Sequence, residues 1–167
     1  MLQISWIYYI ICVVLAASVI GVLRFYRQGW IKSVAAGLTV SYMFLVLSIT
    51  VLSRGPTEHP FNYFPPFWAY REIFSGSEIA QSLTIQIIVN IFMLAPLGFL
   101  LPFITTRKPI LYGILFSLFI EILQYLTKRG YFEIDDIIHN TIGLLIGYGF
   151  YQLTTKYFEL RRKKDES

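Results

Sequence analysis

Apolar runs of membrane-spanning length constrain this chain more than any other feature of its sequence. Four of them cover Ile4 to Leu23, Ile31 to Leu52, Ser82 to Phe103 and Pro109 to Thr127. A helix needs about 20 apolar residues to cross the roughly 30 Å of hydrocarbon in a bilayer. A further helix, whose purely apolar part is shorter, is expected to begin near Ile134. The sequence therefore predicts an all-α, polytopic membrane bundle with five transmembrane helices.

The composition agrees with a membrane location. Hydrophobic residues make up 56% of the 167 residues and charged residues 14%, whereas soluble domains carry about 25% charged residues. We expect residues 1–167 to form a single membrane domain whose main partner is the lipid bilayer. The formal net charge is +4, but the basic residues stand in short loops and at the C-terminus, so no nucleic-acid partner is expected.

The positions of the basic residues predict the orientation. The loop after the first apolar run contains Arg24, Arg27 and Lys32 and no acidic residue. Because loops rich in Lys and Arg stay in the cytoplasm, the N-terminus is expected outside and the C-terminus inside. Arg107 and Lys108 in the next inner loop fit this assignment, as does a basic cytoplasmic tail at 156–167.

The outer segment between the second and third runs differs from the rest of the chain. Pro65 and Pro66 end any helix before them, and the residues after them predict a short amphipathic helix on the outer leaflet. Phe67 and Trp68 begin this helix. It is either an interfacial anchor or a lid and ligand groove over the polar residues described next. The preceding residues Arg54, Glu58 and His59 are expected to be solvated.

Polar residues follow one face of the fourth apolar run. Glu121, Gln124 and Lys128 are spaced i, i+3 and i+7, and Ser117 and Gly113 continue the same face. An ionisable group at the centre of a membrane helix costs at least about 2.5 to 3.5 kcal/mol. The face should therefore contact protein or water, and its charged members are candidate functional residues.

The helix beginning near Ile134 carries a second polar face. Asp136 and Asn140 lie one turn apart, and Gly143 and Gly147 extend their face with residues that permit close helix contact. A second pair, Asp135 and His139, lies about 100° round the same helix. Asn90 in the third run is expected at a depth in the bilayer similar to that of Glu121.

Several motifs follow one another over about 61–151. They are FNYFPPF, then Asn90 with APLGFLLP, then EILQ, EIDD and HNTIGLLIGYG. In this order and spacing they resemble the VanZ-like family. The resemblance implies a small protein of the bacterial plasma membrane that lowers susceptibility to teicoplanin-class glycopeptide antibiotics. It supplies no mechanism.

Three functional hypotheses follow. In the first, an outer-facing pocket binds a lipid-tailed glycopeptide or a cell-wall lipid precursor, and its carboxylates meet drug amines. In the second, an intramembrane enzyme acts on a lipid-linked headgroup, with Glu121 as acid or base, Arg129 steadying a phosphate and Asp136 orienting water. In the third, a small proton-coupled carrier uses Glu121 and oligomerises, with Gly143 and Gly147 as one contact face.

A structural alternative stands beside them. A buried Glu121 paired with Arg129, or hydrogen-bonded by Gln124 and Asn90, would only lock helices together. The candidate catalytic residues are Glu121, Asp136 and Arg129, with no metal or cofactor expected. The candidate binding residues are Asn90, Gln124, Asp135, His139, Asn140, Phe67 and Trp68.

Overall fold

The computed structural model describes residues 6–57 and 65–166. The first residues of the expected first span, from Ile4, lie outside these ranges. So do Glu58, His59 and the first four residues of FNYFPPF.

All regular elements among the described residues are helical, which confirms the predicted all-α class. In chain order they are α1 (Trp6–Phe25), α2 (Trp30–Leu47), the π-helix η1 (Ser48–Leu52), α3 (Trp68–Ser75), α4 (Ala80–Ile104), α5 (Pro109–Leu126) and α6 (Ile134–Asp165).

Four membrane-spanning candidates emerge from length and composition: α1, α2 continued by η1, α4 and α5. Their limits agree with the expected spans to within a few residues. The 32-residue α6 begins at Ile134, as predicted, but is not among the four. Its first turn contains Asp135 and Asp136, and its last turn is basic, so its composition alone does not mark it as a span.

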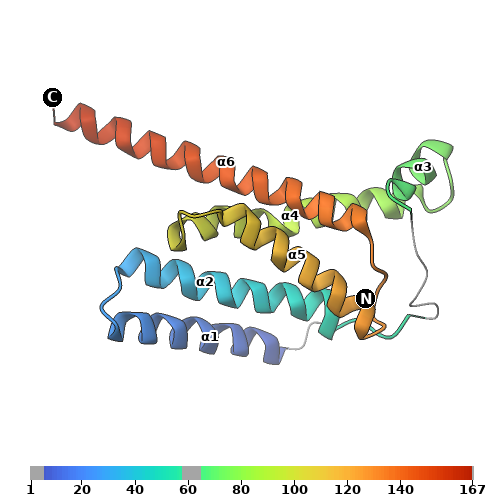
Figure 1. Cartoon of the computed structure of the whole chain (residues 1–167), viewed down its shortest axis with the longest axis horizontal. Helices are drawn as coiled ribbons and strands as arrows, with labels where there is room; N and C mark the ends of the chain where they lie inside the picture. The colour runs from blue at the N-terminus through green and yellow to red at the C-terminus, as the bar shows by residue number, and fades with distance from the viewer. Residues whose placement is uncertain (1–5, 58–64, 167) are drawn as a thin grey trace.

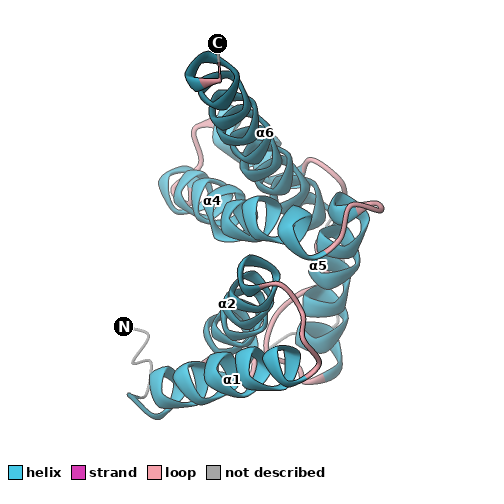
Figure 2. Ribbon diagram, turned by 90° about the vertical axis from the view of Figure 1, so that its left-hand side faces the viewer, coloured by secondary structure: helices cyan, strands magenta, loops and turns pink. Residues whose placement is uncertain are grey.

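The long helices are stacked side by side, as Figure 1 shows. Figure 2 places α2 between α1 on one side and α4 with α5 on the other. The α1–α2 contact includes a reciprocal pair: the Ser41 hydroxyl donates to the Cys12 carbonyl at 2.7 Å, and the Cys12 thiol to the Ser41 carbonyl at 3.4 Å. The α1–α2 loop, the α4–α5 loop and the end of α6 lie at one end of the stack, and α3 and the α5–α6 turn lie at the other.

The closest helix contact in the fold is between α6 and α4. A Cβ atom added at Gly143 would overlap the carbonyl oxygen of Ile91, and one at Gly147 would overlap that of Ala95. At Gly98 of α4, an added Cβ would likewise meet the backbone of Leu144. Small residues allow such backbone contact, which is a main source of helix association in lipid. The two α6 glycines therefore pack helices within the subunit.

A small apolar core fills the space between α2, α4, α5 and α6. Its buried members are Val46, Leu94, Leu97, Phe116, Ile120 and Leu144. A hydrogen bond from the Tyr42 hydroxyl to the Met93 carbonyl, 2.8 Å long, links α2 to α4 just before Pro96. The helix α4 continues through Pro96 to Ile104. The apolar core thus fills the bundle below the polar residues, which lie at the end near α3 and the α5–α6 turn.

The glycine contacts predict a position-specific effect of added methyl groups. Gly143→Ala and Gly147→Ala should lower stability by about 1–3 kcal/mol, the usual cost of overpacking. Gly149→Ala is the matched control, because an added Cβ there has no neighbour within 4 Å and alanine favours the helix by about 1 kcal/mol. Melting temperatures of the purified variants in detergent micelles check this. Equal melting temperatures for all three would contradict the close contact.

Candidate functional site

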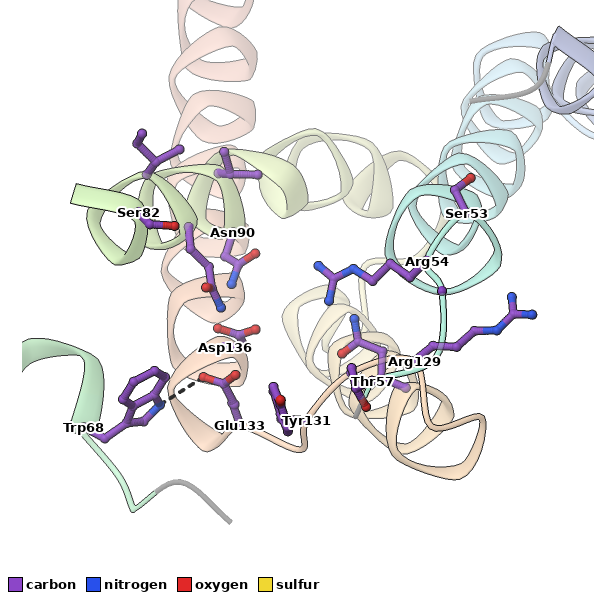
Figure 3. Close-up of a pocket in the computed structure, with 16 residues that line it drawn as sticks. Ser53, Arg54, Thr57, Trp68, Ser82, Asn90, Arg129, Tyr131, Glu133 and Asp136 are labelled. Carbon is purple, nitrogen blue, oxygen red and sulfur yellow. Dashed lines mark hydrogen bonds between the residues drawn. The ribbon is translucent and has the colours of Figure 1, made fainter. Parts of the chain in front are cut away.

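A cavity of about 760 Å³ opens at the end of the bundle where η1, the α5–α6 turn and the starts of α3, α4 and α6 come together. Figure 3 shows its polar side chains arriving from these separate segments. It is lined by Ser53, Arg54, Gly55, Thr57, Trp68, Ser82, Ile85, Gln86, Val89, Asn90, Gln124, Arg129, Gly130, Tyr131, Glu133 and Asp136.

Two carboxylates form the acidic wall of the cavity. Asp136, a predicted site residue, lies in the first turn of α6, and Glu133 immediately precedes that helix. Glu133 is 8% exposed, and its Oε2 accepts a hydrogen bond from Trp68 Nε1 at 3.0 Å. Burial, reinforced by the charge of Asp136, raises the pKa of Glu133 to about 7. This carboxyl group therefore changes its charge near neutral pH.

Arg54 supplies the opposite charge. Its guanidinium points across the cavity toward the side where Asn90 and Asp136 lie (Figure 3). No ion pair joins Arg54 to a carboxylate in the part of the chain that the structure describes. Its positive charge acts on Glu133 from a distance and opposes the rise in the pKa of that group. Arg54 is exposed, as expected of a loop residue, but it faces the cavity.

Asn90 brings an amide to the cavity from α4. The side chain is 8% exposed, and Nδ2 has no hydrogen-bond partner among the residues that the structure describes. Leaving a buried amide donor unpaired costs about 1–3 kcal/mol. The predicted binding role of Asn90 thus has a structural basis: a free donor faces a space large enough for a ligand or water.

Gln124 and Arg129 also line the cavity, but their donors are directed at η1. Gln124 Nε2 donates to the Thr50 carbonyl at 3.1 Å, and the Arg129 guanidinium donates to the carbonyls of Val51 and Leu52 at 3.2 and 3.0 Å. The last carbonyls of a helix lack partners within it. Figure 3 shows the Arg129 guanidinium turned away from Glu133 and Asp136. These two residues hold the end of η1 against α5 and the α5–α6 turn.

Glu121 lies behind the cavity and does not line it. It is 2% exposed, and its Oε2 accepts a hydrogen bond from the Glu133 backbone N–H at 3.1 Å. No ion pair connects Glu121 with Arg129 among the described residues. Asn140 is also buried, and its Nδ2 donates to the Ser117 hydroxyl at 2.9 Å. Both contacts connect α5 with α6.

The remaining predicted residues dock α3 onto α6. The Phe67 backbone N–H donates to Asp135 Oδ1 at 2.7 Å, and the Tyr70 hydroxyl and His139 Nε2 are 2.7 Å apart. With the Trp68–Glu133 bond, they hold the short helix against the start of α6. Sequence reasoning missed the roles of Tyr70, Glu133 and Arg54. The signal for Glu133 was its place directly before the acidic first turn of α6.

The conformation of Phe67 supports this docking. Its φ of 63° is left-handed and uncommon for a residue other than glycine. The backbone is therefore held in place by the contacts around it. The aromatic ring of Phe67 is 57% exposed. Among the residues described, no three His, Cys, Asp or Glu side chains converge in a way suited to a metal ion.

A model of the protein family described as VanZ/LLP1 matches residues 6–155. The chain belongs to the VanZ/LLP1 family. This confirms the resemblance seen in the sequence motifs and extends it to the first helices, in which no motif was recognised. The VanZ/LLP1 match includes all the residues that line the cavity. Comparisons with curated proteins and with solved structures gave no match.

The raised pKa of Glu133 predicts a pH-dependent stability difference. The buried carboxyl group holds its proton up to about pH 7 in the folded protein but loses it above about pH 4.3 in the unfolded chain. Folded protein therefore binds more protons in this window, and stability falls as the pH rises through it. Glu133→Gln should match the wild type near pH 5 and be more stable at pH 8.

Melting curves of both proteins at several pH values measure this difference. The exposed Glu78→Gln is the control, since it removes a carboxylate that does not line the cavity. A constant offset between wild type and Glu133→Gln at every pH would show that Glu133 does not titrate in this window.

Proposed function

We propose that this protein contributes to resistance to lipid-tailed glycopeptide antibiotics of the teicoplanin class, by binding a drug or a cell-envelope lipid in the cavity at the outer face of the bacterial plasma membrane. Membership of the VanZ/LLP1 family supports the resistance role. The observation that carries the binding role is the cavity of about 760 Å³ itself, which Glu133 and Asp136 line together with Arg54, a cation that forms no ion pair among the described residues.

The distribution of basic residues supports an outer location of the cavity. The α1–α2 loop carries Arg24 and Arg27, the α4–α5 loop carries Arg107 and Lys108, and the last turn of α6 is basic. These three segments lie together at the end of the bundle opposite the α5–α6 turn (Figure 1). By the positive-inside rule that end is cytoplasmic, so the N-terminus and the cavity are outside.

Packing supports α6 as a fifth span. Its residues Gly143 and Gly147 lie against the backbone of α4, which is itself a span candidate. A helix in backbone contact with a membrane span shares its depth in the bilayer. Asp136 and Lys156 stand on either side of this contact, so the charges of α6 fall near the two interfaces.

The chemistry of the cavity fits an amphiphile. Glu133 and Asp136 offer negative charge to an amine, as expected for drug recognition. Trp68 gives an apolar wall, and the exposed Phe67 and Phe74 add aromatic residues at the start and near the end of the same short helix. Aromatic side chains favour the membrane interface, where an acyl chain would lie.

If the cavity causes the resistance, removing a charge that lines it should lower resistance, whereas removing a charge elsewhere on the outer side should not. We expect a susceptible bacterium expressing the wild type to show a higher minimal inhibitory concentration of teicoplanin. Asp136→Asn and Arg54→Gln should return it toward the empty-vector value, because each removes a charge from the cavity. Arg71→Gln and Glu78→Gln are matched controls at exposed positions outside it. Membrane levels of each variant are measured by immunoblot.

Full resistance in Asp136→Asn and Arg54→Gln at equal protein levels would contradict a role of the cavity. Binding measurements with the purified protein distinguish direct capture of the drug from an effect of the protein on the membrane. If teicoplanin and vancomycin both fail to bind, the cavity does not capture the drug, and a cell-envelope lipid is the ligand to test.

A second candidate function, an acid–base enzyme acting on a lipid-linked headgroup, is favoured by Glu133. A carboxyl group with a pKa of about 7 at a cavity wall is suited to proton transfer at neutral pH. Mass spectra of lipids from cells expressing the wild type or Glu133→Gln test this. Identical lipid profiles would exclude turnover and leave binding.

A further inference from the structure

We infer that the cavity binds the headgroup of a zwitterionic membrane lipid, in which an ammonium group and a phosphate are joined by a short linker. The ammonium group meets Glu133 and Asp136, and the phosphate meets Arg54 and the Asn90 amide. This inference rests on the same cavity as the proposed function and names the chemical class of its ligand.

The first argument is the separation of charge in the cavity. Glu133 and Asp136 come from the start of α6, while Arg54 comes from the segment after η1 on the facing side (Figure 3). Opposite charges attract each other, and the attraction grows as they approach to form a direct ion pair. Among the described residues Arg54 forms no such pair, and the ion-pair contact of Asp136 is with His139 on the same helix, 4.0 Å between Oδ1 and Nδ1. The two signs are instead held on opposite walls.

The second argument is independent of charge. Asn90 is nine-tenths buried, yet its Nδ2 has no partner and faces the cavity from α4. Its neighbours Gln124 and Asn140, by contrast, both donate to acceptors within the fold. A buried amide donor left open on the side toward which the Arg54 guanidinium points (Figure 3) is suited to a phosphate oxygen, because the amide and the guanidinium can both donate hydrogen bonds to it.

A ligand that carries only positive or only negative charge fits this cavity poorly. An anion at Arg54 would face the carboxylates of Glu133 and Asp136, and a cation at those carboxylates would face Arg54. A partly buried charge is costly unless it is paired. A zwitterion can place its positive group beside the carboxylates and its negative group beside Arg54 at the same time. Neither of its charges then needs a further counterion.

The apolar part of the lining indicates a lipid as the source of the headgroup. Ile85 and Val89 line the cavity from α4 and are 55% and 53% exposed. They belong to a helix long and apolar enough to cross the membrane. The cavity wall is thus continuous with a helix surface that lipid chains would cover. A headgroup in the cavity can keep its acyl chains along this surface.

Fluorescence titration of the full-length protein tests the inference. In a Trp6→Phe, Trp30→Phe background, the remaining Trp68 lines the cavity and reports on its occupancy. The probes are short-chain phosphatidylethanolamine, phosphatidylglycerol with the same chains, and glycerophosphoethanolamine, which has no chains. At pH 8, we expect phosphatidylethanolamine to bind about tenfold more tightly than either of the others.

Variants assign the two ends of the headgroup. Asp136→Asn should abolish the preference for phosphatidylethanolamine over phosphatidylglycerol, because only the first carries an ammonium group. Arg54→Gln should weaken both lipids alike, because both carry a phosphate. Arg71→Gln and Glu78→Gln should change neither affinity. Melting temperatures confirm that each variant is folded.

Three results would overturn the inference: equal affinity of the wild type for the two lipids, a preference that survives in folded Asp136→Asn, or chainless headgroup binding as tightly as the lipid. Failure here is distinct from failure of the proposed function. Resistance without a lipid preference refutes the zwitterion site alone. A lipid preference without any resistance refutes the resistance role alone.

Discussion

The backbone contact between α6 and α4 is the constraint on which the rest of the structure depends. Gly143 and Gly147 let the two helices approach until carbonyl oxygens occupy the space where Cβ atoms would otherwise be. Since α6 is a rigid helix, this contact fixes the position of its first turns as well. Asp136 and Asn140 are thereby placed toward α4 and α5, and the cavity acquires its acidic wall.

The polar residues divide into those that connect helices and those that face open space. Glu121, Gln124 and Arg129 direct their polar atoms at backbone groups of neighbouring segments. Hydrogen bonds of this kind stabilise a bundle in lipid, where the hydrophobic effect between helices is weak. Asn90 and Arg54 have no comparable protein partner among the described contacts. The helix-connecting interpretation therefore applies to Glu121, Gln124 and Arg129, whereas a binding role of the residues that face the cavity stays a prediction.

Helical periodicity predicted which residues share a helix face, but the hydrogen-bond partners of those residues depend on the tertiary structure. The spacing of Glu121 and Gln124 correctly placed both on the buried face of α5, and Ile134 was correctly predicted as the start of α6. Periodicity has no information on residues in turns, so Glu133 and Arg54 were not recognised as cavity residues. A short helix was found after Pro66, as expected, but its docking on α6 depends on contacts between residues 65 or more positions apart.

Trp68 links the docking of α3 to the state of the cavity. Its indole N–H donates to Glu133, and the same side chain lines the cavity. A carboxylate accepts a stronger hydrogen bond when it is ionised than when it is neutral. An ammonium group bound beside Glu133 favours the ionised form, which strengthens the bond to Trp68 as well. A ligand of the kind proposed above would therefore favour the docking of α3 through the same charge that binds it, because Trp68 both lines the cavity and holds Glu133.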